Sequence, residues 1–415
     1  MTYEEMLRRL VGLRRFGMRP GLDGIRELLE RLQPAFAGGT VVHVGGTNGK
    51  GSTAAMIEAG LRADGRRTGL YTSPHLLRFT ERIRIDGVEI SRDGAAHIAE
   101  EIFASSKDGG EHTFFEVATA MAFAAFARAS VDVAVLEVGL GGRLDATNVV
   151  ERPAVALVTS VGLDHVDVLG GTRAAIAREK AGIWKRGCPA LFACEDEEAA
   201  AVLQAEAERV GAAPIERFGR DFDDRGLPPL ALAGAHQRRN AALARRALER
   251  MGVGAAAIAA GLGGVKWPGR MERLSPTVIV DAAHNEEGAR ALAAAWPDGE
   301  DEWTLVLGVV ADKDARAIVQ PLVGKTKRVI VTAPPSPRAL PAEELARLVP
   351  GARVAKDLRE ALAMAEAAGE KVVVAGSIFL VGEARRVVLG EEADVVAAQD
   401  PPAGSAGRAE AGQKL

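Results

Sequence analysis

Short apolar runs alternate with helical patterns along most of the chain. In the first half, five runs are typical of buried strands: Val41–Val44, Gly69–Thr72, Val131–Val138, Ala154–Thr159 and Ala190–Ala193. Runs that are apolar at nearly every position, with helices between several of them, indicate a parallel sheet covered on both faces. Two further segments, Arg82–Ile85 and Val88–Ile90, flank Asp86-Gly87 and predict a small hairpin beside this sheet.

The second half repeats the pattern after an interruption. A helix from about Gln237 to Met251 is followed by the segments Gly261–Gly264 and Lys266–Arg270, which suggest a hinge. Four more strands follow, at Thr277–Val280, Thr304–Leu307, Arg328–Val331 and Lys371–Val374. We therefore predict an α/β protein with two doubly wound domains, residues 1–264 and a smaller Rossmann-like unit at 265–394. Residues 395–415 lack periodicity, and we expect them to be disordered.

The composition of the chain indicates which kinds of partner it can bind. With 415 residues, 47% of them apolar, the chain is long enough for more than one core. A net charge of −4 gives no reason to expect nucleic acid or an anionic membrane as a partner, so small molecules are favoured. The two cysteines, Cys188 and Cys194, suit neither a zinc site nor a disulfide framework, and this fits a reducing cytoplasm.

The chain shows no sequence signal for a membrane or for secretion. The first ten residues predict a charged amphipathic helix rather than a signal peptide. The longest apolar stretch, Val117–Ala127, is far shorter than the ~20 residues that a bilayer requires. We therefore expect a soluble cytoplasmic protein, most simply a monomer.

A glycine-rich segment follows the first predicted strand. Residues 45–52 read Gly-Gly-Thr-Asn-Gly-Lys-Gly-Ser, directly after Val41–Val44. Glycines let successive backbone N–H groups converge on an anion, the following helix presents its positive end, and one lysine, here Lys50, reaches the outer phosphates. The segment departs from the strict phosphate-loop pattern, because Gly51 separates Lys50 from Ser52. We therefore predict a nucleoside triphosphate site unlike that of common GTPases and kinases.

Polar side chains at the ends of two other strands predict a ligand site at the same edge of the sheet. Glu137 interrupts the third apolar run just before a glycine-rich turn, where an open parallel sheet binds its ligand. We interpret it as a metal ligand; the alternative is a carboxylate that caps the next helix or pairs with Arg143. His165, after the fourth run, either ligates Mg²⁺ or hydrogen-bonds a loop. Lys180 by itself is typical of a solvated helical lysine.

Taken together, the motifs resemble one family: the folylpolyglutamate synthase and dihydrofolate synthase branch of the Mur ligase superfamily. Those in the first half are Gly46-Thr-Asn-Gly-Lys-Gly-Ser52, Tyr71-Thr-Ser-Pro-His-Leu76, Arg78-Phe-Thr-Glu-Arg82, Thr113-Phe-Phe-Glu116, Glu137-Val-Gly-Leu-Gly-Gly-Arg-Leu-Asp-Ala-Thr-Asn148, Asp164-His165 and Glu179-Lys-Ala-Gly-Ile183. Those in the second half are His236-Gln-Arg-Arg-Asn-Ala241, Pro268-Gly-Arg270, Asp281-Ala-Ala-His-Asn285, Asp312-Lys-Asp314 and Gly376-Ser-Ile-Phe379. Glu286 and Glu287 depart from the family, which commonly has proline after His-Asn, but acids suit the start of a helix.

The resemblance implies an N-terminal Mur-ligase-type ATPase domain, a smaller C-terminal domain and ATP-dependent amide-bond formation. The carboxylate of dihydropteroate or of a folate would attack the γ-phosphate of ATP to give an acyl phosphate. The amine of L-glutamate would then displace phosphate, so that the products are dihydrofolate or folylpolyglutamates with ADP and phosphate. The cofactor would be Mg²⁺, with two sites expected.

The resemblance also assigns residues to the parts of the site. Catalytic roles fall to Lys50, to His165 and to Lys180, which the family carries as a carbamate. ATP would be bound by Gly49, Lys50, Gly51, Ser52, Asn240, Arg270, Asp281 and His284. The metal ligands would be Ser73, Glu137 and His165. The pterin and folate side would be formed by Gly21, Leu22, Thr113, Phe115, Glu116, Asp145 and Thr147.

Two other functions share parts of this pattern. A Mur-type peptidoglycan ligase uses the same mechanism, but such enzymes usually carry an additional N-terminal domain for a UDP moiety, and here only about 40 residues precede the glycine-rich loop. A non-ligating NTPase switch would use Lys50 and Ser52 but has no need of Asp281 and His284. The folate ligase is therefore the favoured hypothesis.

Overall fold

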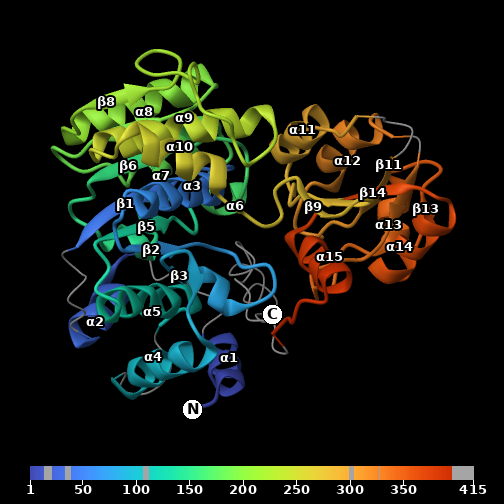
Figure 1. The fold of residues 1–415 in the computed structure, drawn as a ribbon, viewed down its shortest axis with the longest axis horizontal. Helices are drawn as coiled ribbons and strands as arrows, with labels where there is room; N and C mark the ends of the chain where they lie inside the picture. Colours follow the sequence, from blue (N-terminus) through green and yellow to red (C-terminus); the bar gives the residue numbers. More distant parts are fainter. Residues whose placement is uncertain (14–20, 33–38, 106–111, 299–302, 327, 395–415) are drawn as a thin grey trace, which may run out of the picture.

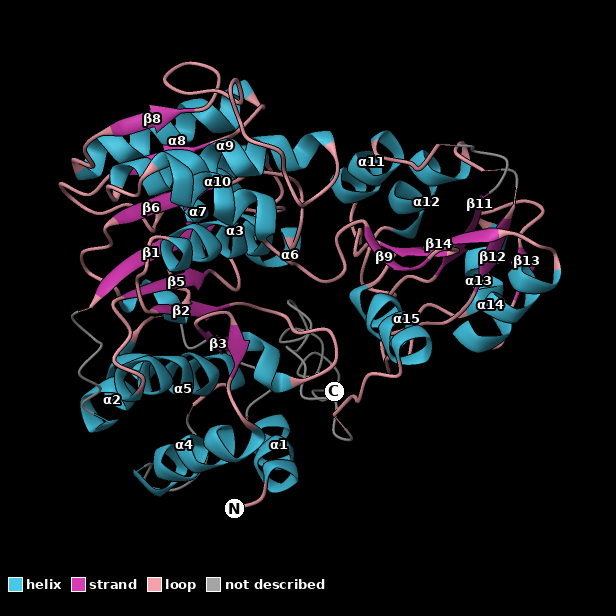
Figure 2. Ribbon diagram, viewed as in Figure 1, coloured by secondary structure: helices cyan, strands magenta, loops and turns pink. Residues whose placement is uncertain are grey.

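The computed structural model describes residues 1–13, 21–32, 39–105, 112–298, 303–326 and 328–394. Within them the chain forms two lobes that lie side by side, each built on one sheet (Figures 1 and 2). The tail that we expect to be disordered, 395–415, lies outside the described residues. Of the helices in the described ranges, none is long and apolar enough to cross a membrane.

In the described residues, the first sheet has eight strands in the order β4-β3-β2-β5-β1-β6-β7-β8. They are β1 Thr40–Gly45, β2 Thr68–Tyr71, β3 Ile83–Ile85, β4 Val88–Glu89, β5 Val133–Glu137, β6 Val155–Val158, β7 Ala190–Phe192 and β8 Ile215–Arg217. Neighbouring strands from β2 across to β8 are parallel. At one edge β3 pairs antiparallel with β2, and β3 and β4 form the predicted hairpin. All the strands predicted for this half are confirmed. The sequence prediction missed β8, a three-residue edge strand.

Helices cover both faces of this sheet, as its apolar strands predict. One face packs on α3 Lys50–Ala63, α9 Ala235–Arg250 and α10 Ala255–Gly264. The other face is covered by α5 Phe114–Arg128, α7 Arg173–Ala181 and α8 Glu197–Val210. A further layer, α1 Tyr3–Gly12, α2 Asp23–Leu32 and α4 Arg92–Ser105, packs on α5 (Figure 1). Short turns of helix, η2 Phe79–Arg82, η3 Ala146–Val149 and α6 Val166–Leu169, lie in the loops between strands.

The hinge was predicted from two segments, Gly261–Gly264 and Lys266–Arg270, and the prediction is wrong for the first of them. These residues end α10 instead of forming a loop. A Cβ at Gly261 would come 2.4 Å from the backbone N of Gly60 in α3, so glycine is required here for the two helices to approach closely. The connection between the lobes begins only at Val265, the residue that caps α10.

The second sheet has six strands in the described part of the chain, in the order β13-β12-β11-β14-β10-β9. They are β9 Glu272–Ser275, β10 Val278–Val280, β11 Trp303–Leu307, β12 Val329–Val331, β13 Arg353–Val354 and β14 Lys371–Ala375. The helices of this lobe are α11 Glu286–Ala294, α12 Ala315–Val323, α13 Ala342–Arg347, α14 Leu358–Ala367 and α15 Ile378–Leu389. The four predicted strands are confirmed and all parallel neighbours, whereas the two edge strands β9 and β13 were missed. The mostly parallel two-sheet α/β fold is thus as predicted.

The two sheets position one cleft. Parallel strands bring their carboxyl ends to the same edge of a sheet, so the loops after β1, β2, β5 and β6 meet there. Residues from these loops and from the loop after β10 line a cleft of about 800 Å³ that both lobes share.

Candidate active site

The glycine-rich loop after β1 is shaped for close approach. Gly46 and Gly49 have φ angles of +143° and +85°, and a Cβ at Gly46 would come 1.9 Å from the Thr159 hydroxyl oxygen. The segment that follows β6 holds the loop in place, because Asn48 N donates to Ser160 Oγ at 3.0 Å. Lys50 begins α3, and its Nζ donates to the Thr47 carbonyl at 3.0 Å. The loop therefore presents a lysine and a helix N-terminus to the cleft, as predicted for phosphate binding.

Helix α9 supports this loop from the side. Ser52 is buried, and its Oγ accepts a hydrogen bond of 3.3 Å from Gln237 Nε2, whose amide oxygen accepts one of 3.0 Å from Asn240. A Cβ at Gly49 would come 2.5 Å from Asn240 Oδ1. The predicted ATP residue Asn240 thus lies against the loop. Gln237, which the sequence motif contains but to which no role was assigned, links Asn240 to Ser52.

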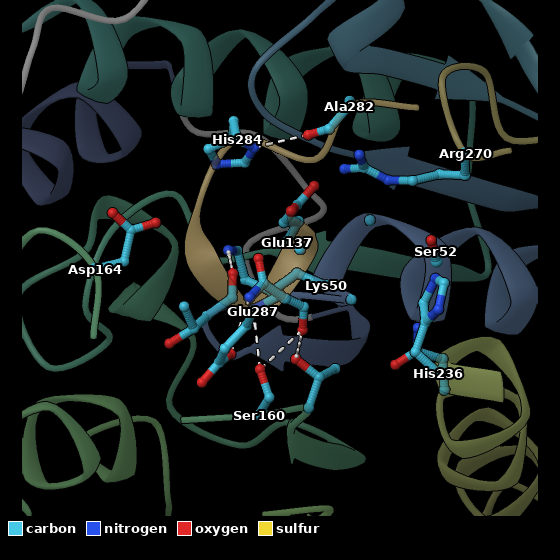
Figure 3. Close-up of a pocket in the computed structure, with 18 of the residues that line it drawn as sticks. Lys50, Ser52, Glu137, Ser160, Asp164, His236, Arg270, Ala282, His284 and Glu287 are labelled. Carbon is cyan, nitrogen blue, oxygen red and sulfur yellow. Dashed lines mark hydrogen bonds between the residues drawn. The ribbon is translucent and has the colours of Figure 1, made fainter. Parts of the chain in front are cut away.

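Glu137 is the last residue of β5 and faces the same cleft (Figure 3). Its carboxylate accepts a hydrogen bond of 3.2 Å from the backbone N of Ser73. Burial raises the pKa of Glu137 to about 7, against the opposing charges of Lys50 and Arg270. The oxygens of this buried carboxylate are hard donors of the kind that Mg²⁺ binds, and a bound cation would keep the carboxylate ionised. It does not cap the helix or pair with Arg143, which instead bonds Glu179 at 2.8 Å.

His165 adopts a left-handed conformation, with φ 51°, at the start of α6. Its Nε2 lies 3.8 Å from Asp164 Oδ1. Partial desolvation in the cleft lowers the pKa of His165 to about 4 despite this carboxylate, which favours the neutral imidazole that a metal ligand must be. In the described residues no three His, Cys, Asp or Glu side chains are grouped closely enough to hold a metal. The predicted set therefore depends on the Ser73 hydroxyl and on oxygens of the nucleotide.

Lys180 is not the solvated lysine that it resembles in isolation. It is buried in α7, and its Nζ donates to the Gly46 carbonyl at 2.8 Å. Burial and the charge of Lys50 lower the pKa of Lys180 to about 7. Its amine is therefore partly unprotonated at neutral pH, directly beneath the phosphate loop.

The second lobe contributes Arg270, Asp281 and His284 to the lining of the cleft. Figure 3 shows Arg270 and His284 across the cleft from Lys50. Asp281 is buried, and its carboxylate accepts backbone hydrogen bonds of 2.9 Å from Met271 and Ala283. His284 Nδ1 donates to the Ala282 carbonyl at 2.8 Å, which leaves Nε2 as the acceptor. Burial lowers the pKa of His284 to about 4. Asp281 thus fixes the turn that presents Arg270 and His284.

The residues predicted for the folate side form a separate group. Thr113 and Glu116 cap α5 reciprocally, with hydrogen bonds of 2.7 and 3.2 Å. Asp145 is buried and accepts from Leu140 N at 2.9 Å and from Thr147 N at 3.0 Å. Phe115 packs on Gly139, where a Cβ would come 2.4 Å from its ring.

The cleft lining, taken over the described residues, contains none of the seven folate-side residues, Gly21, Leu22, Thr113, Phe115, Glu116, Asp145 and Thr147. It does contain residues to which sequence reasoning assigned no role, among them Pro74, His75, Leu140 and Leu169. Phe115 and Asp145 meet the cleft through the turn at Gly139 and Leu140. The folate assignment therefore stays a prediction.

A polar cluster joins the lobes beside the phosphate loop. Asn48 and Asn285 exchange amide hydrogen bonds of 3.0 and 3.3 Å, and Asn48 also donates to Glu287 at 3.0 Å. Asp164 accepts from Asn285 at 3.1 Å and from Lys313 at 2.5 Å. Residues of the second lobe thus hold the phosphate loop directly.

We expect Glu287→Gln to lower the KM for ATP a few-fold. Glu287 places a carboxylate against the phosphate loop. Removing it relieves the repulsion between this carboxylate and the phosphates of ATP, roughly 0.2–1 kcal/mol for partly solvated charges. Glutamine keeps an oxygen that accepts the hydrogen bond from Asn48. Steady-state kinetics at varied ATP test this. Glu286→Gln is the matched control, because Glu286 is exposed and pairs with Arg290. An unchanged or higher KM in Glu287→Gln contradicts the prediction.

Comparisons with known proteins agree with this architecture. Residues 44–225 match the model of the Mur ligase middle domain, and residues 269–378 match that of the Mur ligase, glutamate ligase domain. A Mycobacterium tuberculosis protein described as dihydrofolate synthase/folylpolyglutamate synthase is 39% identical over 88% of this chain and 89% of its own length. Two relatives from Halobacterium salinarum and Haloferax volcanii, described as probable bifunctional folylpolyglutamate synthase/dihydropteroate synthase, are 38% identical, and the chain spans about half of their length.

Solved structures match over both lobes. Escherichia coli FolC in complex with DHPP and ADP has a TM-score of 0.87 at 33% identity, covering 94% of this chain and 98% of that one. A Yersinia pestis bifunctional folylpolyglutamate synthase/dihydrofolate synthase with Mn, AMPPNP and L-glutamate bound has a TM-score of 0.82 at 34% identity, covering 90% and 95%. Because both domain models match in order and the M. tuberculosis relative aligns over most of both sequences, this chain belongs to the folylpolyglutamate synthase/dihydrofolate synthase family of the Mur ligases.

Proposed function

We propose that the chain is an ATP-dependent ligase that joins L-glutamate to the carboxylate of dihydropteroate or of a folate. The observation that carries this proposal is the cleft shared by the lobes, which has Lys50 and the phosphate loop on one side and Arg270 and His284 on the other. A nucleotide switch needs only the first of these sides. The ligand sets of the E. coli and Y. pestis structures, a nucleotide with DHPP in one and with L-glutamate in the other, support the same substrates here.

The reaction has two steps. The acceptor carboxylate attacks the γ-phosphate, the bond to ADP breaks, and an acyl phosphate forms. Lys50 and the first-turn amides of α3 stabilise the charge on the transferred group. The unprotonated amine of L-glutamate then attacks the acyl carbon, and phosphate leaves. The lobes touch at Asn48 and Asn285, and their closure around the substrates would exclude water that hydrolyses the acyl phosphate.

Three residues that line the cleft would form the metal site. Ser73, Glu137 and His165 are oxygen and neutral nitrogen donors and would hold Mg²⁺, which when bound neutralises phosphate oxygens. A carbamate on Lys180 would supply an anionic group for a second Mg²⁺. Cys188 and Cys194 are free thiols, which suits the cytoplasmic location expected from the sequence.

A direct test separates this function from its rivals. ATP turnover should require both a pteroate or folate and L-glutamate. ATP hydrolysis that proceeds equally without them indicates a switch. Turnover that requires a UDP-linked acceptor instead indicates a peptidoglycan ligase.

We also expect one active site to serve both acceptors. In dihydropteroate the reacting carboxyl is on the benzoate ring, whereas in a folate it is the glutamate γ-carboxyl, so the acceptor must shift by about one residue length, ~3.5 Å. Mass spectrometry of products, with dihydropteroate and tetrahydrofolate offered separately, tests it. If dihydropteroate is converted but no diglutamate forms from tetrahydrofolate, only the dihydrofolate synthase activity stands.

A further inference from the structure

The segment after α15 binds back onto the first lobe. We call Glu391–Asp394 the C-terminal strap and residues 72–82 the Ser73 loop. Asp394 N donates to the Leu77 carbonyl at 3.0 Å, and one oxygen of the Asp394 carboxylate accepts from Phe79 N at 2.7 Å and from the Tyr3 hydroxyl at 3.0 Å. A single carboxylate thus joins the strap, the Ser73 loop and α1.

Charged side chains reinforce this contact. Arg78 of the loop donates to the Glu392 carbonyl at 3.1 Å and to the Glu391 carboxylate at 3.4 Å. Arg385 of α15 pairs with Glu391 as well, which keeps the start of the strap on its own lobe. The Ser73 loop is therefore attached to the second lobe through a chain of ion pairs.

Apolar packing connects the same loop to the second lobe. Leu76 belongs to the first lobe by sequence, yet it packs in the hydrophobic cluster of the second lobe that contains Val381. A Cβ at Gly382 would come 2.6 Å from the Leu76 carbonyl oxygen, so α15 lies directly on the loop backbone. The second lobe contacts the loop at Leu76, and the strap contacts it at Leu77 to Phe79.

The loop is internally stiff. The Glu81 carboxylate accepts hydrogen bonds from the backbone N of Leu76, Leu77 and Arg78 at 2.8, 2.9 and 2.9 Å. At its other end, Ser73 N donates to Glu137 at 3.2 Å. Displacement of the loop at Phe79 is therefore passed to Ser73 and to its contact with Glu137 in the cleft.

We propose that Asp394 is a positioning residue for ligation, which sets the Ser73 loop against the second lobe and thereby places Ser73 beside Glu137. This inference rests on the proposed function and on Ser73 as a metal-side residue. Asp394 is not among the residues that line the cleft, so its role concerns the placement of the reacting groups rather than ATP binding.

The test compares Asp394→Ala with Asp394→Asn and with Glu392→Ala. Asp394→Ala should lower kcat on the order of ten-fold, because small misplacements of reacting groups are costly, and raise the Mg²⁺ concentration needed for half-maximal rate, with the Kd for ADP unchanged. Asparagine keeps an oxygen acceptor for Phe79 and should restore most of the rate. Glu392→Ala removes a carboxylate that is 79% exposed and its surface ion pair with Arg92, which is worth about 0–1 kcal/mol, but keeps the carbonyl that Arg78 uses, so its kinetics should match wild type.

Hydrogen–deuterium exchange supplies a readout that does not depend on activity. In Asp394→Ala, exchange should increase in peptides covering residues 72–82 and stay unchanged in peptides covering the phosphate loop. If alanine prevents folding, Asp394→Glu keeps the charge but shifts the carboxylate, and it should show the same pattern more weakly.

Two outcomes overturn the inference: wild-type kinetics and exchange in a folded Asp394→Ala, or equal loss of ADP binding and turnover. Failure of the proposed function has a different signature, because the wild-type protein itself would then form no ligation product.

Discussion

Lys50→Ala should reduce ligation by about 10²–10³-fold, the loss expected when one preorganised charge facing a developing transition-state charge is removed. Lys50 begins α3, lines the cleft, and has its Nζ bonded to the Thr47 carbonyl at 3.0 Å. Loss of that single partly exposed hydrogen bond costs about 0.5–1.5 kcal/mol, so the fold should survive. The effect should lie in turnover at saturating ATP.

The measurement pairs single-turnover ligation with thermal unfolding. Lys356→Ala is a suitable control, since it removes an exposed lysine of the second lobe. Near-normal ligation by Lys50→Ala at saturating ATP shows that the phosphate role of the loop is wrong. A large drop in the melting temperature assigns the loss to folding instead.

The position of Lys50 and Glu137 at one edge of the first sheet could be predicted because the signals are local. The loop at residues 46–49 follows one continuous apolar strand and Glu137 ends another, and strand ends in a parallel sheet face the ligand. Glycine spacing and one carboxylate at a strand end are therefore enough to place Lys50 and Glu137 at the same edge.

Contacts between distant segments are outside the reach of such reasoning. The Asp164–Lys313 pair, the exchange between Asn48 and Asn285, and the contact of Asp394 with Phe79 all join residues far apart in sequence, and no periodicity marks them. Each depends on how the two sheets are placed relative to each other. The contact between Asp394 and Phe79 can therefore be seen only in the folded structure.

Polar or glycine-rich elements fail for a different reason. The missed edge strands β8, β9 and β13 are mostly polar and partly buried or exposed, so they lack the apolar run that marks equally short central strands such as β10 and β12. Gly261 lies in a helix because it packs against Gly60, a tertiary contact that outweighs its low helix propensity.

Lys180 shows how burial changes the interpretation of a residue. As a sequence position it is typical of a solvated lysine, and only the resemblance to the family suggests a carbamate. Its burial and its pKa of about 7 supply the physical condition for that modification, because only the unprotonated amine attacks CO₂. The carbamate nitrogen retains one N–H, which can still donate to the Gly46 carbonyl that Nζ contacts at 2.8 Å.

We therefore expect Lys180→Ala to lose ligation about as severely as Lys50→Ala, and to regain part of it with a small added carboxylate such as acetate. Arginine at this position should not restore activity, because it remains a cation. Formation of the carbamate from the free amine should slow as the pH falls below about 7, since protonation removes the nucleophile.

Isotope-labelled bicarbonate gives the direct readout. A carbamate resonance should appear in wild-type protein, should be absent in Lys180→Ala, and should decline on removal of bicarbonate together with activity. Full activity in Lys180→Ala, or an unmodified amine in a fully active complex, contradicts the carbamate. A second outcome separates the roles of the two lysines: if Lys180→Ala loses ADP binding whereas Lys50→Ala keeps it, then Lys180 acts by supporting the Gly46 carbonyl and the shape of the loop, and added acetate will have no effect.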